Sequence, residues 1–204
     1  MSILLLLLTV WTLYLSKLST HTSSLNYLYN LGYGLFFLLA SISHLLNARK
    51  NQLFRPIFSA VSLASFGYFA GLAIWTYYNL KGLELPYPSL ADIAFLCFYI
   101  FSIVGGIYAT KKIGVSITSS RLIESTILWG LLFAIAYNFV KFNSQMSDVT
   151  PLASFLNLLY PLLDTFLLTL ALMVIRSQTG RLQPSLLYLV FSFLALTLGD
   201  AIFS

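Results

Sequence analysis

The sequence predicts an all-α integral membrane protein, a polytopic bundle of about seven transmembrane helices arranged as helical hairpins. Three observations lead to this fold class: charge is scarce, apolar residues are abundant, and apolar runs recur at the length that a bilayer requires. Lys, Arg, Asp and Glu together make up 8% of the 204 residues, where a soluble domain carries about a quarter. Hydrophobic residues reach 59%. So little charge could not cover a water-facing surface, which excludes a soluble enzyme, a disordered tail and a nucleic-acid-binding module.

Seven apolar segments lie along the chain, separated by Lys, Arg, Pro and Asn. Most of them approach or exceed the roughly 20 residues that span a bilayer as a helix. They lie at about 3–16, 25–46, 55–79, 89–110, 121–141, 151–175 and 182–204. The first is short, and it lacks both the basic start and the small-residue cleavage pattern of a signal peptide, so we interpret it as a marginal spanning helix. We expect the segments to form a single transmembrane domain, residues 1–204.

The basic residues predict the orientation of these helices. If successive connections alternate between the two sides of the membrane, eight of the eleven Lys and Arg residues share one side and three share the other. The eight are Arg49, Lys50, Arg55, Lys111, Lys112, Arg121, Arg176 and Arg181, and the three are Lys17, Lys81 and Lys141. By the positive-inside rule the first group is cytoplasmic. The amino terminus is then expected inside and Ser204 outside.

A weak repeat groups the segments into hairpins. Arg55, Arg121 and Arg181 each begin an outward-going helix, and the first two helices are followed by a proline-bearing loop and a returning helix. Segment 182–204 is then half of a fourth hairpin. We expect either that the bundle ends on an unpaired helix or that these residues are part of a longer chain.

Small residues recur at the spacing that lets membrane helices approach closely. Gly67 and Gly71 form a G-x-x-x-G pattern, and small residues follow the same spacing at Gly130 with Ala134 and at Ala195 with Gly199. We interpret these positions, Gly67, Gly71 and Gly199 above all, as helix packing sites inside the bundle. Self-association of the chain into a homo-oligomer through such a face is the alternative.

The stretch Pro86-Tyr87-Pro88-Ser89-Leu90-Ala91-Asp92 precedes the fourth apolar segment. Ser89 and Asp92 have the spacing of a capping box, in which the serine side chain accepts from an early amide and the acidic side chain reaches back to the serine amide. The helix dipole also favours a negative charge in the first turn. A helix cap is therefore the first interpretation of Ser89 and Asp92, and a contact between Asp92 and a ligand is the second.

Four runs of the sequence resemble a known family. They are "AGLAIWTYYNL", "PYPSLADIAFLCFY", "LYPLLDTFLL" and "LALTLGDAIF", and the resemblance extends over roughly residues 55–204. The chain resembles the multi-pass membrane region at the front of many bacterial histidine kinases and diguanylate cyclases, which carries a P-x-P-S-x-A-D motif, a later Y-P-x-x-D and then a G-D. This resemblance implies a sensor in the bacterial cytoplasmic (inner) membrane that passes a signal to a cytoplasmic catalytic domain. No such domain is present in these 204 residues.

Two carboxylates lie within apolar segments, where a charge costs at least a few kcal/mol and is a functional hypothesis by default. Asp164 follows Tyr160 and Pro161, and the proline interrupts the helix hydrogen bonds nearby. Asp200 follows Gly199 near the end of the last segment. We predict ligand binding by Asp92, Tyr160, Asp164 and Asp200. An aspartyl protease dyad is disfavoured because Asp164 and Asp200 are expected at different depths.

The sequence predicts no catalytic residues, no metal site and no cofactor. His21 and His44 are expected at opposite sides of the membrane, and Cys97 is the single cysteine. The leading hypothesis is therefore a non-enzymatic sensory module for a ligand, a lipid or a membrane state, with the bilayer, a protein partner or a separate output domain as its partners and no nucleic acid. The alternatives are an accessory subunit of a larger membrane complex and, third, a transporter.

Overall fold

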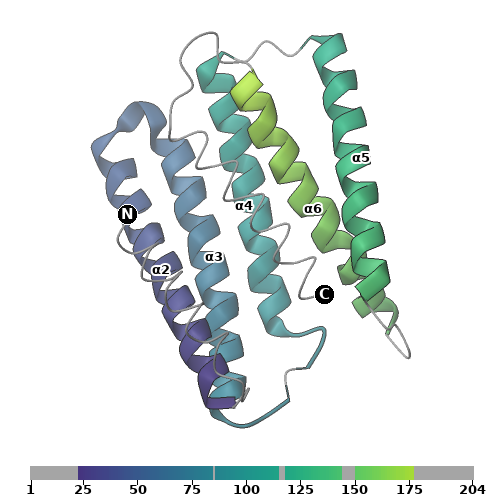
Figure 1. Cartoon of the computed structure of the whole chain (residues 1–204). Coiled ribbons are helices and arrows are strands. Elements are labelled where there is room, and N and C mark those ends of the chain that lie inside the picture. Colours follow the sequence, from purple (N-terminus) through teal and green to yellow (C-terminus); the bar gives the residue numbers. More distant parts are fainter. Residues whose placement is uncertain (1–22, 85, 115–117, 144–149, 177–204) are drawn as a thin grey trace. The chain divides into compact units, whose positions relative to one another are not determined.

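The computed structural model describes residues 23–84, 86–114, 118–143 and 150–176, and all regular structure in these ranges is helical (Figure 1). The short 3-10 helix η1 joins the first two of the long helices. The elements are α2 (Ser23–Lys50), η1 (Gln52–Phe54), α3 (Arg55–Leu80), α4 (Leu90–Ile113), α5 (Ser119–Asn143) and α6 (Pro151–Arg176). No strand occurs in the described ranges.

All five long helices are long and apolar enough to cross a membrane. The shortest qualifying stretch, on α5, has 20 residues, which at a rise of 1.5 Å per residue is about 30 Å, the thickness of a bilayer's hydrocarbon core. Large apolar side chains such as Leu39, Ile100 and Ile135 are exposed. Such exposure is a liability in water but is ordinary for helices that face lipid tails. The structure is therefore compatible with a membrane protein.

The helix ends agree closely with the ranges expected from the sequence. The largest difference is at the end of α2, which continues to Lys50 where the apolar run suggested an end at about residue 46. The basic residues at this end extend the helix because cations are favourable near a helix C-terminus. The first and seventh predicted segments, 3–16 and 182–204, lie outside the described residues, so seven spans stay a prediction.

The chain divides into two compact units, Met1–Gly105 and Gly106–Ser204, and the division falls within α4. The first unit contains α2, η1, α3 and most of α4, and the second contains the end of α4 with α5 and α6. The expectation of a single domain over residues 1–204 stays a prediction. Each unit is described by itself below.

In the first unit, α2 and α3 form a hairpin and lie side by side (Figure 1). A reciprocal pair of hydrogen bonds joins them: Ser41 Oγ donates to the Ser62 carbonyl at 2.9 Å and Ser62 Oγ donates to the Ser41 carbonyl at 2.8 Å. Both serines are buried. Nearby, Phe37 stacks on Tyr68 with ring centroids 4.2 Å apart. Hydroxyl pairs of this kind hold apolar helices together where no hydrophobic effect separates protein from lipid.

Glycines bring α3 and α4 into close contact. A Cβ added at Gly67 would lie 2.9 Å from the Ala94 carbonyl oxygen and 3.2 Å from the Cys97 Cβ atom. A Cβ added at Gly71 would lie 2.5 Å from the ring of Phe95. Both glycines of the predicted G-x-x-x-G pattern are therefore at a helix contact. Gly130, in α5, differs because no atom of the described residues lies within 4 Å of the corresponding position.

In the second unit, α5 and α6 pack through Trp129 and Phe166. The two rings meet edge to face with centroids 5.8 Å apart. The indole Nε1 of Trp129 also donates a hydrogen bond of 3.3 Å to the carbonyl of Leu162. The indole N–H of Trp129 on α5 thus finds its hydrogen-bond acceptor in the backbone of α6.

Substitution of Gly67 by Ala is expected to destabilise the α3–α4 contact by about 1–3 kcal/mol, because the new methyl group meets backbone atoms that cannot rotate away. Gly32 in α2 is the matched control. No described atom lies within 4 Å of its Cβ position, so Gly32→Ala is expected to be neutral or to stabilise the helix by up to about 1 kcal/mol. Thermal unfolding in detergent, followed by circular dichroism, measures both. Equal stability of Gly67→Ala and wild type would contradict the close packing.

Candidate functional site

The loop before α4 brings together several of the residues singled out by the sequence. α3 ends at Leu80, and two residues later Gly82 has a φ of 62°, a left-handed conformation that glycine adopts without strain. The amide of Leu83 donates to the Tyr78 carbonyl at 3.1 Å, which closes the helix end and turns the chain toward residues 86–89. The Tyr87–Pro88 peptide bond is cis.

Ser89 and Asp92 make the two side-chain hydrogen bonds of a capping box. The Ala91 amide donates to Ser89 Oγ at 3.2 Å, and the Ser89 amide donates to Asp92 Oδ2 at 2.6 Å. Ser89 Oγ also donates to Asp92 Oδ2 at 3.1 Å. The Asp92 side chain is only 6% exposed and lies in the first turn of α4, where the helix dipole favours its charge. These bonds pair polar groups at the start of α4 that the helix itself leaves without an intrahelical partner.

The pKa of Tyr87 depends on its burial and on the nearby carboxylate of Asp92. Burial and, secondarily, the negative charge of Asp92 raise the pKa of Tyr87 to about 12. Both causes act against the phenolate, the first by withholding solvent and the second by repulsion. The loop therefore presents a neutral phenol and a carboxylate at the start of α4.

An aromatic cluster lies one turn further along α4, and the sequence interpretation did not include it. Phe95 meets Trp75 and Tyr68 of α3 edge to face, with ring centroids 5.1 Å and 5.2 Å apart. The indole Nε1 of Trp75 is buried and makes no hydrogen bond to any described residue. The signal in the sequence was the spacing of seven between Tyr68 and Trp75, which places both on one face of α3.

The second candidate place is on α6 around Asp164. Asp164 and Thr165 are each 1% exposed, although both lie in the middle of an apolar helix. Pro161 has no amide hydrogen, so it cannot donate the usual helix bond. Thr165 Oγ1 donates to the Pro161 carbonyl at 2.7 Å and lies 3.2 Å from the Leu162 carbonyl, which also accepts from Trp129. Polar atoms of α5 and α6 thus gather around the turn that precedes Asp164.

The predicted ligand-binding residues fall in different parts of the molecule. Asp92 belongs to the first unit, while Tyr160, which is partly buried, and Asp164 lie one turn apart on α6 in the second. Asp200 and Gly199 lie outside the described residues. The structure therefore groups Tyr160 with Asp164 and Ser89 with Asp92, each pair within its own unit.

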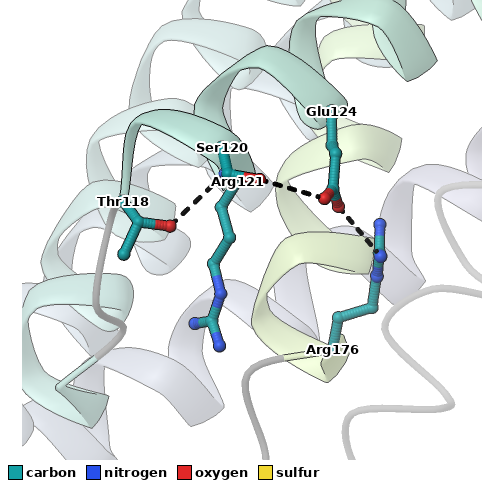
Figure 2. A network of polar contacts seen from close by, with 5 residues as sticks. All are labelled: Thr118, Ser120, Arg121, Glu124 and Arg176. Atoms are coloured by element: carbon teal, nitrogen blue, oxygen red, sulfur yellow. Dashed lines mark hydrogen bonds and ion pairs between the residues drawn. The ribbon is translucent and has the colours of Figure 1, made fainter.

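The ends of α5 and α6 are joined by a polar network, which Figure 2 shows. Arg176 Nη2 lies 3.1 Å from Glu124 Oε2, and Ser120 Oγ lies 3.4 Å from Glu124 Oε1. The side chains of Arg176 and Glu124 are 65% and 50% exposed. Glu124 also follows Arg121 by three residues on α5, a spacing typical of a local ion pair, and its ion pair with Arg176 reaches the next helix. An exposed pair of this kind contributes at most about 1 kcal/mol.

Within the described residues, no group of three or more His, Cys, Asp and Glu side chains could hold a metal ion. His44 stacks on Phe58 with ring centroids 6.2 Å apart. Its neighbourhood is therefore aromatic.

No family model, no curated protein and no solved structure matches this chain. The proposed function therefore rests on the geometry around Asp92 and around Asp164.

Titration of Tyr87 tests the electrostatics of the loop. We expect Asp92→Asn to lower the pKa of Tyr87 below about 12 and to leave it above the ordinary value of 10.0, because burial is the larger cause and remains. Phenolate absorbance as a function of pH, taken as the difference between each protein and its Tyr87→Phe counterpart, isolates this group from the other tyrosines. Because the folded-state pKa is raised, wild type should lose stability between pH 10 and 12 more steeply than Tyr87→Phe. An unchanged pKa in Asp92→Asn would contradict the interaction.

Proposed function

We propose that this protein is a non-enzymatic, membrane-embedded sensory module that detects a ligand, a lipid or a membrane state and passes the signal to a cytoplasmic output. One observation carries the proposal: Asp164 is 1% exposed in the middle of a helix long and apolar enough to cross a membrane. The resemblance to the membrane regions of bacterial sensor kinases and diguanylate cyclases supports it as well.

The physical argument rests on the cost of a carboxyl group at that position. An acidic side chain within a membrane helix costs a few kcal/mol or more when charged, and that cost depends on what surrounds it. A ligand, a water molecule or a change in packing near Asp164 therefore shifts the balance between its protonated and charged forms and between arrangements of α6 that suit each form. In the turn before Asp164, the carbonyls of Pro161 and Leu162 accept hydrogen bonds from Thr165 and Trp129, outside the regular helix pattern.

The output end in this proposal is the network at Arg176. Arg176 lies twelve residues after Asp164 on α6, which is about 18 Å along the helix axis. A helix is stiff over that distance, so a displacement at Asp164 reaches Arg176. The pair that Arg176 forms with Glu124 is exposed and weak, so it can break and re-form at little cost.

The location belongs to the same proposal. The module lies in a bacterial cytoplasmic membrane, with the amino terminus and the basic connections on the cytoplasmic side. Its partner is a separate protein or an output domain on the same polypeptide. The distribution of Lys and Arg supports this orientation.

A second candidate function is an accessory subunit of a larger membrane complex. It is favoured by α5, which exposes Ile123, Ile127, Leu131 and Ile135 at intervals of four residues, a single stripe on the helix. Lipid or another protein chain could cover such a stripe. Purification in a mild detergent discriminates the two functions, because stably co-purifying proteins favour the subunit and an isolated monomer or dimer favours the sensor.

Substitution of Asp164 by Asn tests the sensory function. Spin labels placed at Ser119 and Ile175, in a Cys97→Ser background, report the distance between the ends of α5 and α6 in lipid vesicles. We expect this distance distribution to change in wild type with pH or with the fraction of phosphatidylglycerol in phosphatidylcholine vesicles. In Asp164→Asn it is expected to stay fixed, because the side chain can no longer change its charge.

Glu84→Gln is the matched control, since it makes the same isosteric change at an exposed carboxylate that lies after α3, outside α5 and α6. It is expected to retain the response and to lose at most about 1 kcal/mol of stability. If wild type shows one invariant distribution under all these conditions, or if Asp164→Asn responds as wild type does, the sensory proposal is wrong.

A further inference from the structure

The turn between α2 and α3 concentrates positive charge. Arg49 and Lys50 are the last two residues of α2, and Arg55 is the first residue of α3, so seven consecutive positions hold three cations. All three side chains are exposed. The helix η1 joins them and belongs to the same compact unit, in contact with both α2 and α3.

The protein supplies no counter-charge for this turn in the part of the chain that the structure describes. Arg49, Lys50 and Arg55 form no ion pair with any described residue, and the pair between Arg176 and Glu124 lies in the other unit. The sequence explains why: the first acidic residue of the chain is Glu84, which follows the opposite end of α3. Neither α2 nor α3 carries a carboxylate.

Helix dipoles favour two of these cations and oppose the third. Arg49 and Lys50 lie at the C-terminus of α2, where positive charge is stabilised. Arg55 lies at the N-terminus of α3, which is the positive end of that helix, and the first turn contains no acidic residue and no capping side chain. An external anion beside Arg55 would therefore relieve a repulsion that the protein itself leaves uncompensated.

An apolar side chain lies within the same turn. Leu53, in η1, is 61% exposed and is flanked in the sequence by the three cations. The turn joins two helices that are each able to cross a membrane, so it emerges where the hydrocarbon ends and the phosphate groups begin. Positive charge beside an exposed apolar group matches the boundary between a lipid's phosphate and its acyl chains.

From this charge and exposure we propose that the α2–α3 turn, residues 49–55, binds the phosphate group of an anionic lipid. Arg49, Lys50 and Arg55 hold the phosphate, and Leu53 lies against the upper acyl chains. Anionic lipids are abundant on the side of a membrane to which basic residues localise, and a phosphate diester accepts hydrogen bonds from guanidinium groups in a forked geometry. This site is independent of Asp164 and belongs to the other unit.

Lipid binding by the purified full chain tests the proposal. Native mass spectrometry from detergent, with phosphatidylglycerol or phosphatidylcholine added at equal concentration, measures how many lipids of each kind remain bound. Wild type should prefer phosphatidylglycerol. The combined variant R49Q/K50Q/R55Q should lose that preference by on the order of 100-fold, and R55Q alone by about fivefold, which is the effect expected for each cation near an anionic surface.

Lys81→Gln is the matched control for a single charge. Lys81 is also exposed, forms no ion pair with any described residue and lies just beyond the opposite end of α3. Its substitution should change the preference by less than about twofold. Equal losses in K81Q and R55Q would show that net charge alone decides binding and would overturn the site.

Two further measurements separate a lipid from a soluble anion. Leu53→Ser should weaken phosphatidylglycerol binding while the three cations remain, since it removes the apolar contact. Inorganic phosphate, added as a competitor, should displace the lipid poorly for the same reason. If inorganic phosphate competes as well as glycerophospholipid and L53S binds as wild type does, the turn is a general phosphate site and the lipid proposal is wrong. Unchanged thermal unfolding of each variant shows that the fold is intact.

Discussion

The structure depends on one constraint, which is that backbone amides and carbonyls within an apolar surrounding must find their partners inside the protein. Helices satisfy this requirement without help from neighbouring chains, and this is why the described residues form long helices and short connections. Polar side chains obey the same constraint. Thr76, Thr126 and Thr169 each donate to a carbonyl four residues earlier on their own helix. Their hydroxyl groups therefore add no unsatisfied donor to the apolar faces.

Polar side chains that instead bond to a different helix mark the contacts between helices. Ser41 and Ser62 exchange hydrogen bonds between α2 and α3, and Trp129 of α5 reaches a carbonyl of α6. At Gly67 the absence of a side chain lets the backbone of α4 approach directly. Each of these contacts is specific in geometry, in contrast to the apolar side chains around them, which are interchangeable against lipid. Fold specificity in such a protein thus resides in a small number of polar and small residues.

The sequence was sufficient for the helices and for the local cap. Apolar runs of bilayer length define α2 to α6 because the bilayer imposes a minimum length, and Ser89 with Asp92 were predictable because a capping box is a local pattern of three residues' separation. Tertiary features were less accessible. The partner of Glu124 is Arg176, 52 residues away, and no local rule distinguishes it from the nearer Arg121.

The cluster formed by Tyr68, Trp75 and Phe95 was missed for the same reason. Aromatic residues are common throughout this chain, at 16% of the sequence, so their spacing on α3 alone did not indicate which of them meet α4. The burial of Asp164 likewise required the structure, since a carboxylate in an apolar run can face lipid, water or protein. Long-range packing decides among these, and it is encoded in shape complementarity rather than in periodicity.

The length of α3 has a consequence for the bilayer itself. Its 26 residues extend for about 39 Å, whereas the hydrocarbon layer is about 30 Å thick. If α3 crosses a bilayer along its whole length, the excess obliges the helix to incline, to project into the headgroup layer at one or both ends, or to thicken the surrounding leaflets. A thin bilayer increases the incline and a thick one reduces it. Because α2 packs against α3 as a hairpin, α2 would incline with it. Bilayer thickness would then set the tilt of both helices.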